Sequence, residues 1–205
     1  MRKEHLAAKI FKDLTWHFAG RENEIFLTFD DGPTPEVTPW LLSLLKEFDA
    51  LATFFCIGGK VERYPDLYQQ ILEEGHSVGN HGYLHMNGWR TGTSKYVSNV
   101  KRASQFIDSK LFRPPYGRLK PKQLTQLKSE FRIVMWDVLS KDYETGVSEE
   151  KCLQNVLDYA ESGSIIVFHD TEQAERNIKY ALPRILDHYS QQNVVFNAIE
   201  FDKIT

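Results

Sequence analysis

Residues 25–33 read IFLTFDDGP, an apolar run that ends in two adjacent carboxylates and a Gly-Pro break. A short apolar run bounded by turn residues is typical of a fully buried strand. Asp30 and Asp31 repel each other, and burying either charge is unfavourable unless a cation or hydrogen-bond donors compensate for it. The stretch therefore predicts a buried strand whose end lies next to a compensating group.

Further strand candidates alternate with segments of helical spacing. The predicted strands are residues 25–29, 52–57, 76–79, 111–112, 132–138, 164–168 and 194–197. The predicted helices are residues 37–48, 65–74, 95–108, 121–129, 148–161 and 177–191. Such alternation implies parallel strands joined by right-handed crossovers, which is an α/β fold. About seven repeats can close a sheet, so we expect a single distorted (β/α) barrel with its active site at the C-terminal ends of the strands.

The length of 205 residues suits one domain, and we divide the chain into an N-terminal amphipathic extension, residues 1–24, and a barrel domain, residues 25–205. We expect the start of the extension, residues 1–20, to form an amphipathic helix. The formal charge of −3 offers no broad basic surface, so neither nucleic acid nor a membrane is an expected partner. Cys56 and Cys152 lack ligand-like spacing and are expected to be buried thiols.

The first residues are basic, as in a secretory leader, but Lys9, Lys12 and Asp13 interrupt any apolar core. No run approaches the ~18 apolar residues that span a bilayer. The sequence therefore predicts a cytoplasmic protein, or an extracytoplasmic one if the start of the chain has been trimmed. It gives no indication of the oligomeric state.

Polar side chains that fit neither a core nor a solvated face follow five of the predicted strands. They are Asp30 and Asp31, His81 and His85, Arg113 and Tyr116, Asp137 and Asp142, and His169 and Asp170. In parallel α/β folds, the loops at the C-terminal edge converge around one mouth, where ligands bind. We therefore expect these side chains to form one site.

The stretch GNHGYLHMN places His81 and His85 four positions apart, which a single helical turn would bring to one face. Taken alone, the pair also fits two unrelated surface histidines. Two histidines with one carboxylate are a familiar ligand set for a catalytic zinc-like ion, which would also offset the adjacent acids. We predict one divalent metal ion, Zn²⁺ in the first place, with Co²⁺, Ni²⁺ or Mn²⁺ as alternatives.

Two further motifs supply polar groups to the same edge. His169 ends the apolar strand of IIVFHD and, although it also fits a structural histidine, imidazole suits proton donation near neutral pH. The stiff loop of FRPPYG would fix Arg113 and the backbone N–H of Tyr116. Arg113 can then pair with whichever acid is not a ligand, and the Tyr116 N–H can meet a developing oxyanion.

The motifs TFDDGP, HxxxH, RPPYG, WDVLSKDY and IIVFHD occur in an order and spacing that resemble the polysaccharide deacetylase family, the chitooligosaccharide deacetylase homology domain of carbohydrate esterase family 4. The resemblance implies a distorted barrel and a metal-dependent hydrolase that removes N-acetyl, and sometimes O-acetyl, groups from chitin- or peptidoglycan-type sugars. An acetylated carbohydrate is thus the expected partner. The alternatives are a metal amidase acting on a small non-sugar N-acyl compound and a non-catalytic glycan-binding barrel.

The resemblance also implies a role for each motif. Asp30 is the expected general base, oriented by Arg113, and Asp31, His81 and His85 are the expected metal ligands. The remaining expected catalytic groups are the Tyr116 N–H for the oxyanion, His169 for protonation of the leaving amine, and Asp142 to tune His169. The residues expected to contact the substrate are Tyr116, Tyr143, Ile165, Val167 and, next to the histidine pair, Trp89.

Two motifs depart from the family pattern. The second motif usually has serine or threonine after its first histidine, whereas this chain has Gly82, so a loop-fixing hydroxyl is missing. The fourth motif commonly reads D-x-x-D-W, and here Leu139 and Tyr143 replace the first acid and the tryptophan. Because the base, the ligands and the acid are all present, we expect an active enzyme.

Overall fold

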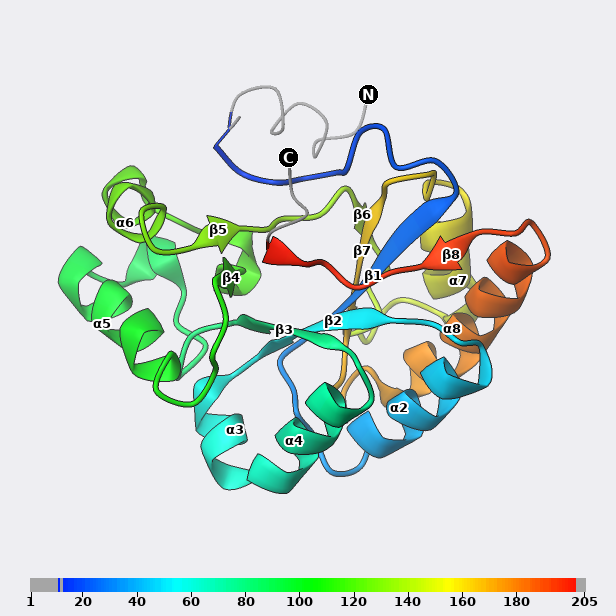
Figure 1. Ribbon diagram of the computed structural model, residues 1–205, viewed down its shortest axis with the longest axis horizontal. Helices are drawn as coiled ribbons and strands as arrows, with labels where there is room; N and C mark the ends of the chain where they lie inside the picture. Colours follow the sequence, from blue (N-terminus) through cyan, green and yellow to red (C-terminus); the bar gives the residue numbers. More distant parts are fainter. Residues whose placement is uncertain (1–10, 12, 202–205) are drawn as a thin grey trace.

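The computed structural model describes residues 11 and 13–201 (Figure 1). Its strands are β1 (Glu24–Asp30), β2 (Ala52–Cys56), β3 (Ser77–Asn80), β4 (Leu111–Phe112), β5 (Arg132–Ile133), β6 (Val138–Leu139), β7 (Ile165–His169) and β8 (Val195–Phe196). Its helices are α2 (Thr38–Glu47), α3 (Gly58–Arg63), α4 (Pro65–Glu73), α5 (Thr93–Ala103), α6 (Pro121–Leu127), α7 (Glu149–Leu157) and α8 (Glu175–Ser190). Two short 3₁₀ turns, η1 (Gly88–Arg90) and η2 (Pro115–Gly117), lie in loops.

The sheet has the order β5-β4-β3-β2-β1-β7-β6, and every pair along it is parallel. β8 adds to the start of β1, also in parallel. The sheet curls, with the helices around its outside (Figure 1). Since β5 and β6 are the two ends of this path within the described chain, the barrel is open between them. The predicted α/β fold with a distorted barrel is confirmed.

β1 lies at the centre of the sheet because its side chains are apolar toward both layers. Leu27 and Phe29 join the outer core between the sheet and the helices. Phe26 points the other way, into a smaller cluster inside the barrel that includes Phe55 and Ile165. This interior cluster fills the lower part of the barrel, and a pocket opens above it, at the C-terminal ends of the strands.

The predicted strand 132–138 is wrong as a single element, because the chain forms β5 and β6 with a crossing between them. In this crossing, Val134 pairs with Thr15 from the N-terminal segment, and Met135 N–H donates to Thr15 O at 2.7 Å. The crossing thus spans the opening of the barrel, with the N-terminal segment as a local partner. Apolar side chains continue from Ile133 through Trp136, which explains the expectation of one strand, although the backbone bends at Asp137.

The predicted N-terminal extension is only partly described, since residues 1–10 and 12 lie outside the described range. From residue 13 to residue 23, turns and two isolated bridges replace the expected helix. His17 forms the second bridge, antiparallel to Ser164 just before β7. No helix in the described part of the chain is long and apolar enough to cross a membrane.

Candidate active site

A pocket of about 350 Å³ opens at the C-terminal ends of the strands. Its lining residues come from six loops and strand ends: Asp30, Asp31, His81, His85, Tyr116, Trp136, Leu139, Tyr143, Val167, His169, Thr171 and Gln173. The parallel strands carry their following loops to the same edge, which is why motifs distant in sequence meet here. The structure therefore brings together seven polar or aromatic residues that the sequence places in one site, along with Val167.

Asp31, His81 and His85, here called the Asp31 cluster, group their side chains around one point. Oδ1 of Asp31 lies 3.0 Å from Nε2 of His85 and 3.4 Å from Nε2 of His81. This oxygen is buried and accepts no hydrogen bond. Tetrahedral ligands about 2.1 Å from an ion lie about 3.4 Å apart, so an orphaned buried oxygen at these distances fits a shared divalent cation.

The protonation states of the Asp31 cluster suit metal ligation. Burial lowers the pKa of His81 to about 4, although the nearby carboxylates raise it, so the ring is neutral near pH 7. Its Nδ1–H donates to the Arg113 carbonyl at 2.7 Å, which turns Nε2 toward Asp31. Burial alone would raise the pKa of Asp31, but the contacts with His85 and His81 outweigh it and lower the pKa.

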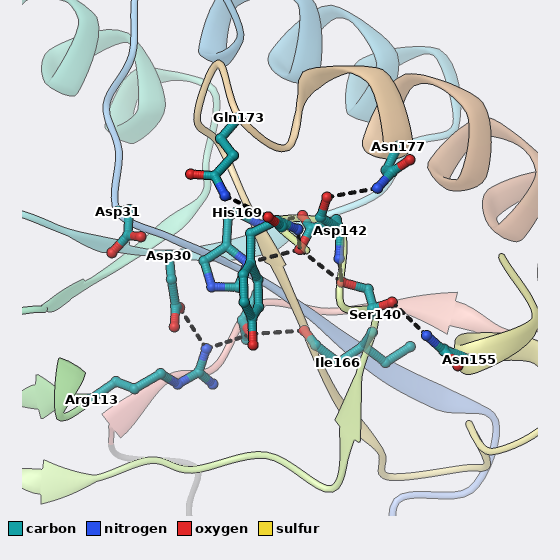
Figure 2. A network of polar contacts seen from close by, with 12 residues as sticks. Asp30, Asp31, Arg113, Ser140, Asp142, Asn155, Ile166, His169, Gln173 and Asn177 are labelled. Atoms are coloured by element: carbon teal, nitrogen blue, oxygen red, sulfur yellow. Dashed lines mark hydrogen bonds and ion pairs between the residues drawn. The ribbon is translucent and has the colours of Figure 1, made fainter. Parts of the chain in front are cut away.

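Asp30 is held by a buried arginine. Nη1 of Arg113 donates to Oδ1 of Asp30 and to Oγ1 of Thr28, both at 2.7 Å. Nε and Nη2 of Arg113 donate to the carbonyls of Val134 and Met135, and the guanidinium lies over the Phe55 ring. Figure 2 shows Arg113 pointing at Asp30 from below, with Asp31 beside it. The pairing compensates both buried charges and leaves Oδ2 of Asp30 on the side of His81, 4.0 Å from its Nε2.

His169 is held by a second buried carboxylate. Its Nδ1–H donates to Oδ1 of Asp142 at 2.8 Å, and its backbone N–H donates to Oδ2 at 2.6 Å (Figure 2). Ser140 and Asn177 fix Asp142 in turn, through its side chain and its carbonyl. Burial would lower the pKa of His169, but the charge and hydrogen bond of Asp142, with Asp30 and Asp31, raise it to about 9. The imidazole is therefore protonated near neutral pH, with Nε2 left for the pocket.

The residues expected to contact a substrate divide into two groups. Tyr116, Tyr143 and Val167 line the pocket, and the ring of Tyr143 meets the ring of His169 edge-on at 4.7 Å between centroids. Ile165 does not line the pocket. It faces the same side of β7 as Val167 but lies two residues earlier, so its side chain is deeper in the barrel, within the interior cluster. Trp89 is 60% exposed, lies next to Arg118, and is also absent from the lining.

Sequence reasoning missed Trp136, Thr171 and Gln173 as lining residues. Trp136 lies in the crossing that was expected to be a strand, and the other two follow His169 closely enough to have been considered. Gln173 lies over the pocket edge, where its Nε2 donates to the carbonyl of Tyr143 (Figure 2). Leu139, noted only as a departure from the family pattern, also lines the pocket.

Asp137 and Asp170 were expected at the pocket edge and lie elsewhere. Asp137 is at the opposite end of the barrel, where it accepts hydrogen bonds from Ser164 Oγ and the Ile165 N–H and pairs with His17. The extra residues of the crossing carry it there. Asp170 is fully buried behind the loop that follows β1, where it accepts a hydrogen bond from Thr38 Oγ1 at 2.7 Å.

Comparison with known proteins gives one consistent family. A family model described as polysaccharide deacetylase matches residues 19–133. A peptidoglycan-N-acetylglucosamine deacetylase of Bacillus cereus is 37% identical over 163 residues, which cover 75% of this chain but only 59% of that protein. A chitooligosaccharide deacetylase of Azorhizobium caulinodans is 35% identical over 157 residues, which cover 73% of this chain and 74% of that protein.

A solved structure gives the same result for the fold. The crystal structure of a peptidoglycan N-acetylglucosamine deacetylase superimposes with a TM-score of 0.87 and 30% sequence identity. The superposition covers 94% of this chain and 94% of that one. The two chains therefore share one fold over nearly their whole length.

Proposed function

Since the chain belongs to the polysaccharide deacetylase family, we propose that it hydrolyses the N-acetyl amide of sugars in a peptidoglycan- or chitin-type glycan. Water adds to the acetyl carbonyl, the carbon–nitrogen bond breaks, and acetate and a free amine are released. One observation carries the proposal: a single pocket holds the Asp31 cluster, a carboxylate paired with arginine, and a histidine paired with carboxylate.

The Asp31 cluster would hold one divalent ion, because a carboxylate and two imidazoles are donors that Zn²⁺ favours and that Co²⁺, Ni²⁺ and Mn²⁺ also accept. When bound, such an ion polarises the acetyl carbonyl and makes water more acidic. One of these ligands is already oriented and in the protonation state that binds an ion. The His81 ring is held neutral by burial and oriented by the Arg113 carbonyl, so no proton has to leave it when the ion arrives.

Asp30 is the proposed general base. Arg113 occupies its Oδ1, so Oδ2 is the oxygen left to take a proton from the attacking water. The same oxygen lies on the side of the Asp31 cluster, 4.0 Å from Nε2 of His81. The Tyr116 N–H, in the 3₁₀ turn at the pocket edge, is the proposed donor to the developing oxyanion.

His169 is the proposed general acid. An amine leaves poorly unless it is protonated, so the leaving nitrogen needs a donor that is charged at working pH. Asp142 keeps His169 charged, because it accepts the hydrogen bond of His169 Nδ1–H and helps to raise the pKa of His169 to about 9 against the effect of burial. Nε2 then carries the proton that is given to the amine.

The apolar side chains of Val167, Leu139 and Trp136 are proposed to receive the acetyl methyl group, with Tyr143 and Tyr116 at the rim. With Leu139 where the family commonly has an acid, this wall is more apolar than the family pattern implies. A carbohydrate stacks on aromatic faces, so the exposed rings at the rim are suited to the sugar rather than to the methyl group.

The proposal is tested by acetate release from chitooligosaccharides, peptidoglycan fragments and small N-acetylated amines, together with metal analysis of each protein. Asp30→Asn should abolish turnover and keep the metal, whereas His81→Ala should lose the metal. The wild-type protein should release acetate from glycans. Release from the small amines alone would instead establish the amidase alternative, and an active Asp30→Asn variant would refute the assignment of the base.

A further inference from the structure

The loop that carries His81 and His85 contains an unusual contact with the helix behind it. Gly82 has a φ of +78°, and a Cβ at this position would lie 2.8 Å from Nδ2 of Asn99 on α5. Asn99 is only 7% exposed, and its Nδ2 is buried without a hydrogen-bond partner. A buried amide that donates to nothing is unfavourable, so another contact of this side chain must account for its position.

The oxygen of the same amide makes that contact. Oδ1 of Asn99 accepts a hydrogen bond from the Leu84 N–H at 2.9 Å, in the middle of the turn between the two histidines. Other contacts also hold the turn. The carbonyls of Gly82 and Tyr83 accept from the N–H groups of Gly58 and Gly59, and the Tyr83 hydroxyl donates to Glu62. Asn80, at the end of β3, accepts from the Gly82 N–H at 2.7 Å.

These contacts hold the two ends of the turn differently. Asn80 fixes the side next to His81, which leaves β3 directly. His85, with a φ of +49°, lies further out, and its approach depends on the backbone at Leu84. Asn99 is the side chain that fixes this backbone, and it has room to do so only because position 82 has no side chain.

We propose that Asn99 is a positioning residue for the metal ligands, which fills the space left by Gly82 and holds His85 in reach of Asp31. The inference rests on the proposed function, because it assumes that Asp31, His81 and His85 bind an ion. Asn99 and a side chain at position 82 therefore exclude each other.

The chain offers a matched control for Asn99. Asn155 on α7 is 9% exposed and also uses its amide to hold a loop, since its Nδ2 donates to the Ser140 carbonyl at 2.9 Å. That loop leads to Asp142 and not to the Asp31 cluster. Replacing either asparagine with alanine removes one buried side chain-to-backbone hydrogen bond, so the two variants should lose similar thermal stability without metal.

The test measures zinc affinity of the whole chain by competition with a chromogenic chelator. Asn99→Ala should bind Zn²⁺ about tenfold or more weakly, the range seen when a group that orients a ligand is removed. It should also change the visible absorption of bound Co²⁺, which reports ligand geometry. Asn155→Ala should match the wild type in both measurements.

A double-variant cycle tests the exclusion directly. Gly82→Ser alone should weaken Zn²⁺ binding, because the left-handed backbone and the Asn99 amide both oppose a side chain there. Adding Asn99→Ala relieves only the second effect, so the double variant should bind more tightly than Gly82→Ser. Strict additivity, or wild-type affinity in Asn99→Ala, would overturn the role of Asn99. A wild-type chain that binds no Zn²⁺ would overturn the proposed function as well, and the two failures are thus distinguishable.

Discussion

At the scale of single residues, each group proposed to move a proton belongs to a buried pair. Arg113 donates to the carboxylate of Asp30, and Asp142 keeps His169 charged although burial opposes the charge. The two members of each pair are buried together, and further hydrogen bonds satisfy them. The proposed base and the proposed acid therefore lie in one pocket, each next to a partner of opposite charge.

The alkaline limit of the reaction should follow from the pKa of His169. The acid must be protonated, so kcat/KM should fall as pH rises through that pKa, at about 9 or below it when a cation offsets the charge of Asp31. Asp142→Asn removes the charge that opposes burial, so the alkaline limb should move at least one pH unit toward acid. The measurement is a pH profile of acetate release, and an unmoved limb would assign it to another group.

At the scale of elements, the sequence predicts strands reliably where their side chains are apolar on both faces. β1, β2 and β7 are of this kind and begin and end within about one or two residues of the predicted bounds, which is the usual accuracy of such bounds. The stretch 132–138 fails because residue type cannot reveal that the chain leaves one end of the sheet and rejoins the other. The partner that holds this crossing, Thr15, is more than a hundred residues away in sequence.

The candidate site was predictable to a similar degree and for related reasons. Asp30, Asp31, His81, His85 and His169 follow strands or conspicuous motifs, so parallel topology alone places them together. Trp136 was not predictable, because its position depends on the crossing. The support given by Asn99 was also invisible, since it requires knowing which helix packs behind the histidine turn.

Arg113 joins β1 to the crossing between β5 and β6. Its guanidinium connects β1, at Thr28 and Asp30, with the crossing at Val134 and Met135, across the open side of the barrel. Arg113→Ala should lower the free energy of unfolding by about 3–5 kcal/mol, because it leaves Asp30 charged, buried and unpaired. Denaturant unfolding measures this loss. The exposed Arg176→Ala, which removes a surface pair with Glu149, is the control and should change stability little.

At the scale of the whole molecule, the two ends of the barrel have separate tasks. The pocket lies at the C-terminal end of the strands, and at the other end the N-terminal segment joins the crossing and β7 through Thr15 and His17. In barrels of this kind, residues at the second end contribute to stability and not to chemistry. The lower end should therefore tolerate changes that leave the reaction intact.

His17 provides a test of this separation. Its hydrogen bond to Asp137, opposed by burial, raises its pKa, so the native state favours the charged imidazole. The resulting stabilisation is fully present below the unfolded pKa of about 6.5 and is lost as pH rises through the native pKa. His17→Gln should thus lower the melting temperature more at pH 5.5, where the stabilisation is present, than at alkaline pH, where it is lost. Acetate release should stay unchanged, and a loss of turnover at constant stability would contradict the separation.

The position of β1 at the centre of the sheet also governs when the protein can fold. β1 pairs with β7 across about 138 positions of sequence, as in the hydrogen bond from Thr28 to Ile166. At about 5–20 residues per second, a ribosome needs roughly 7–28 s to produce the partner after the strand itself has appeared. During that interval β1, an apolar strand that ends at the two acids of the pocket, has no partner on the edge that later pairs with β7. We therefore expect the yield of folded protein in a cell to depend on chaperones that cover exposed strand edges.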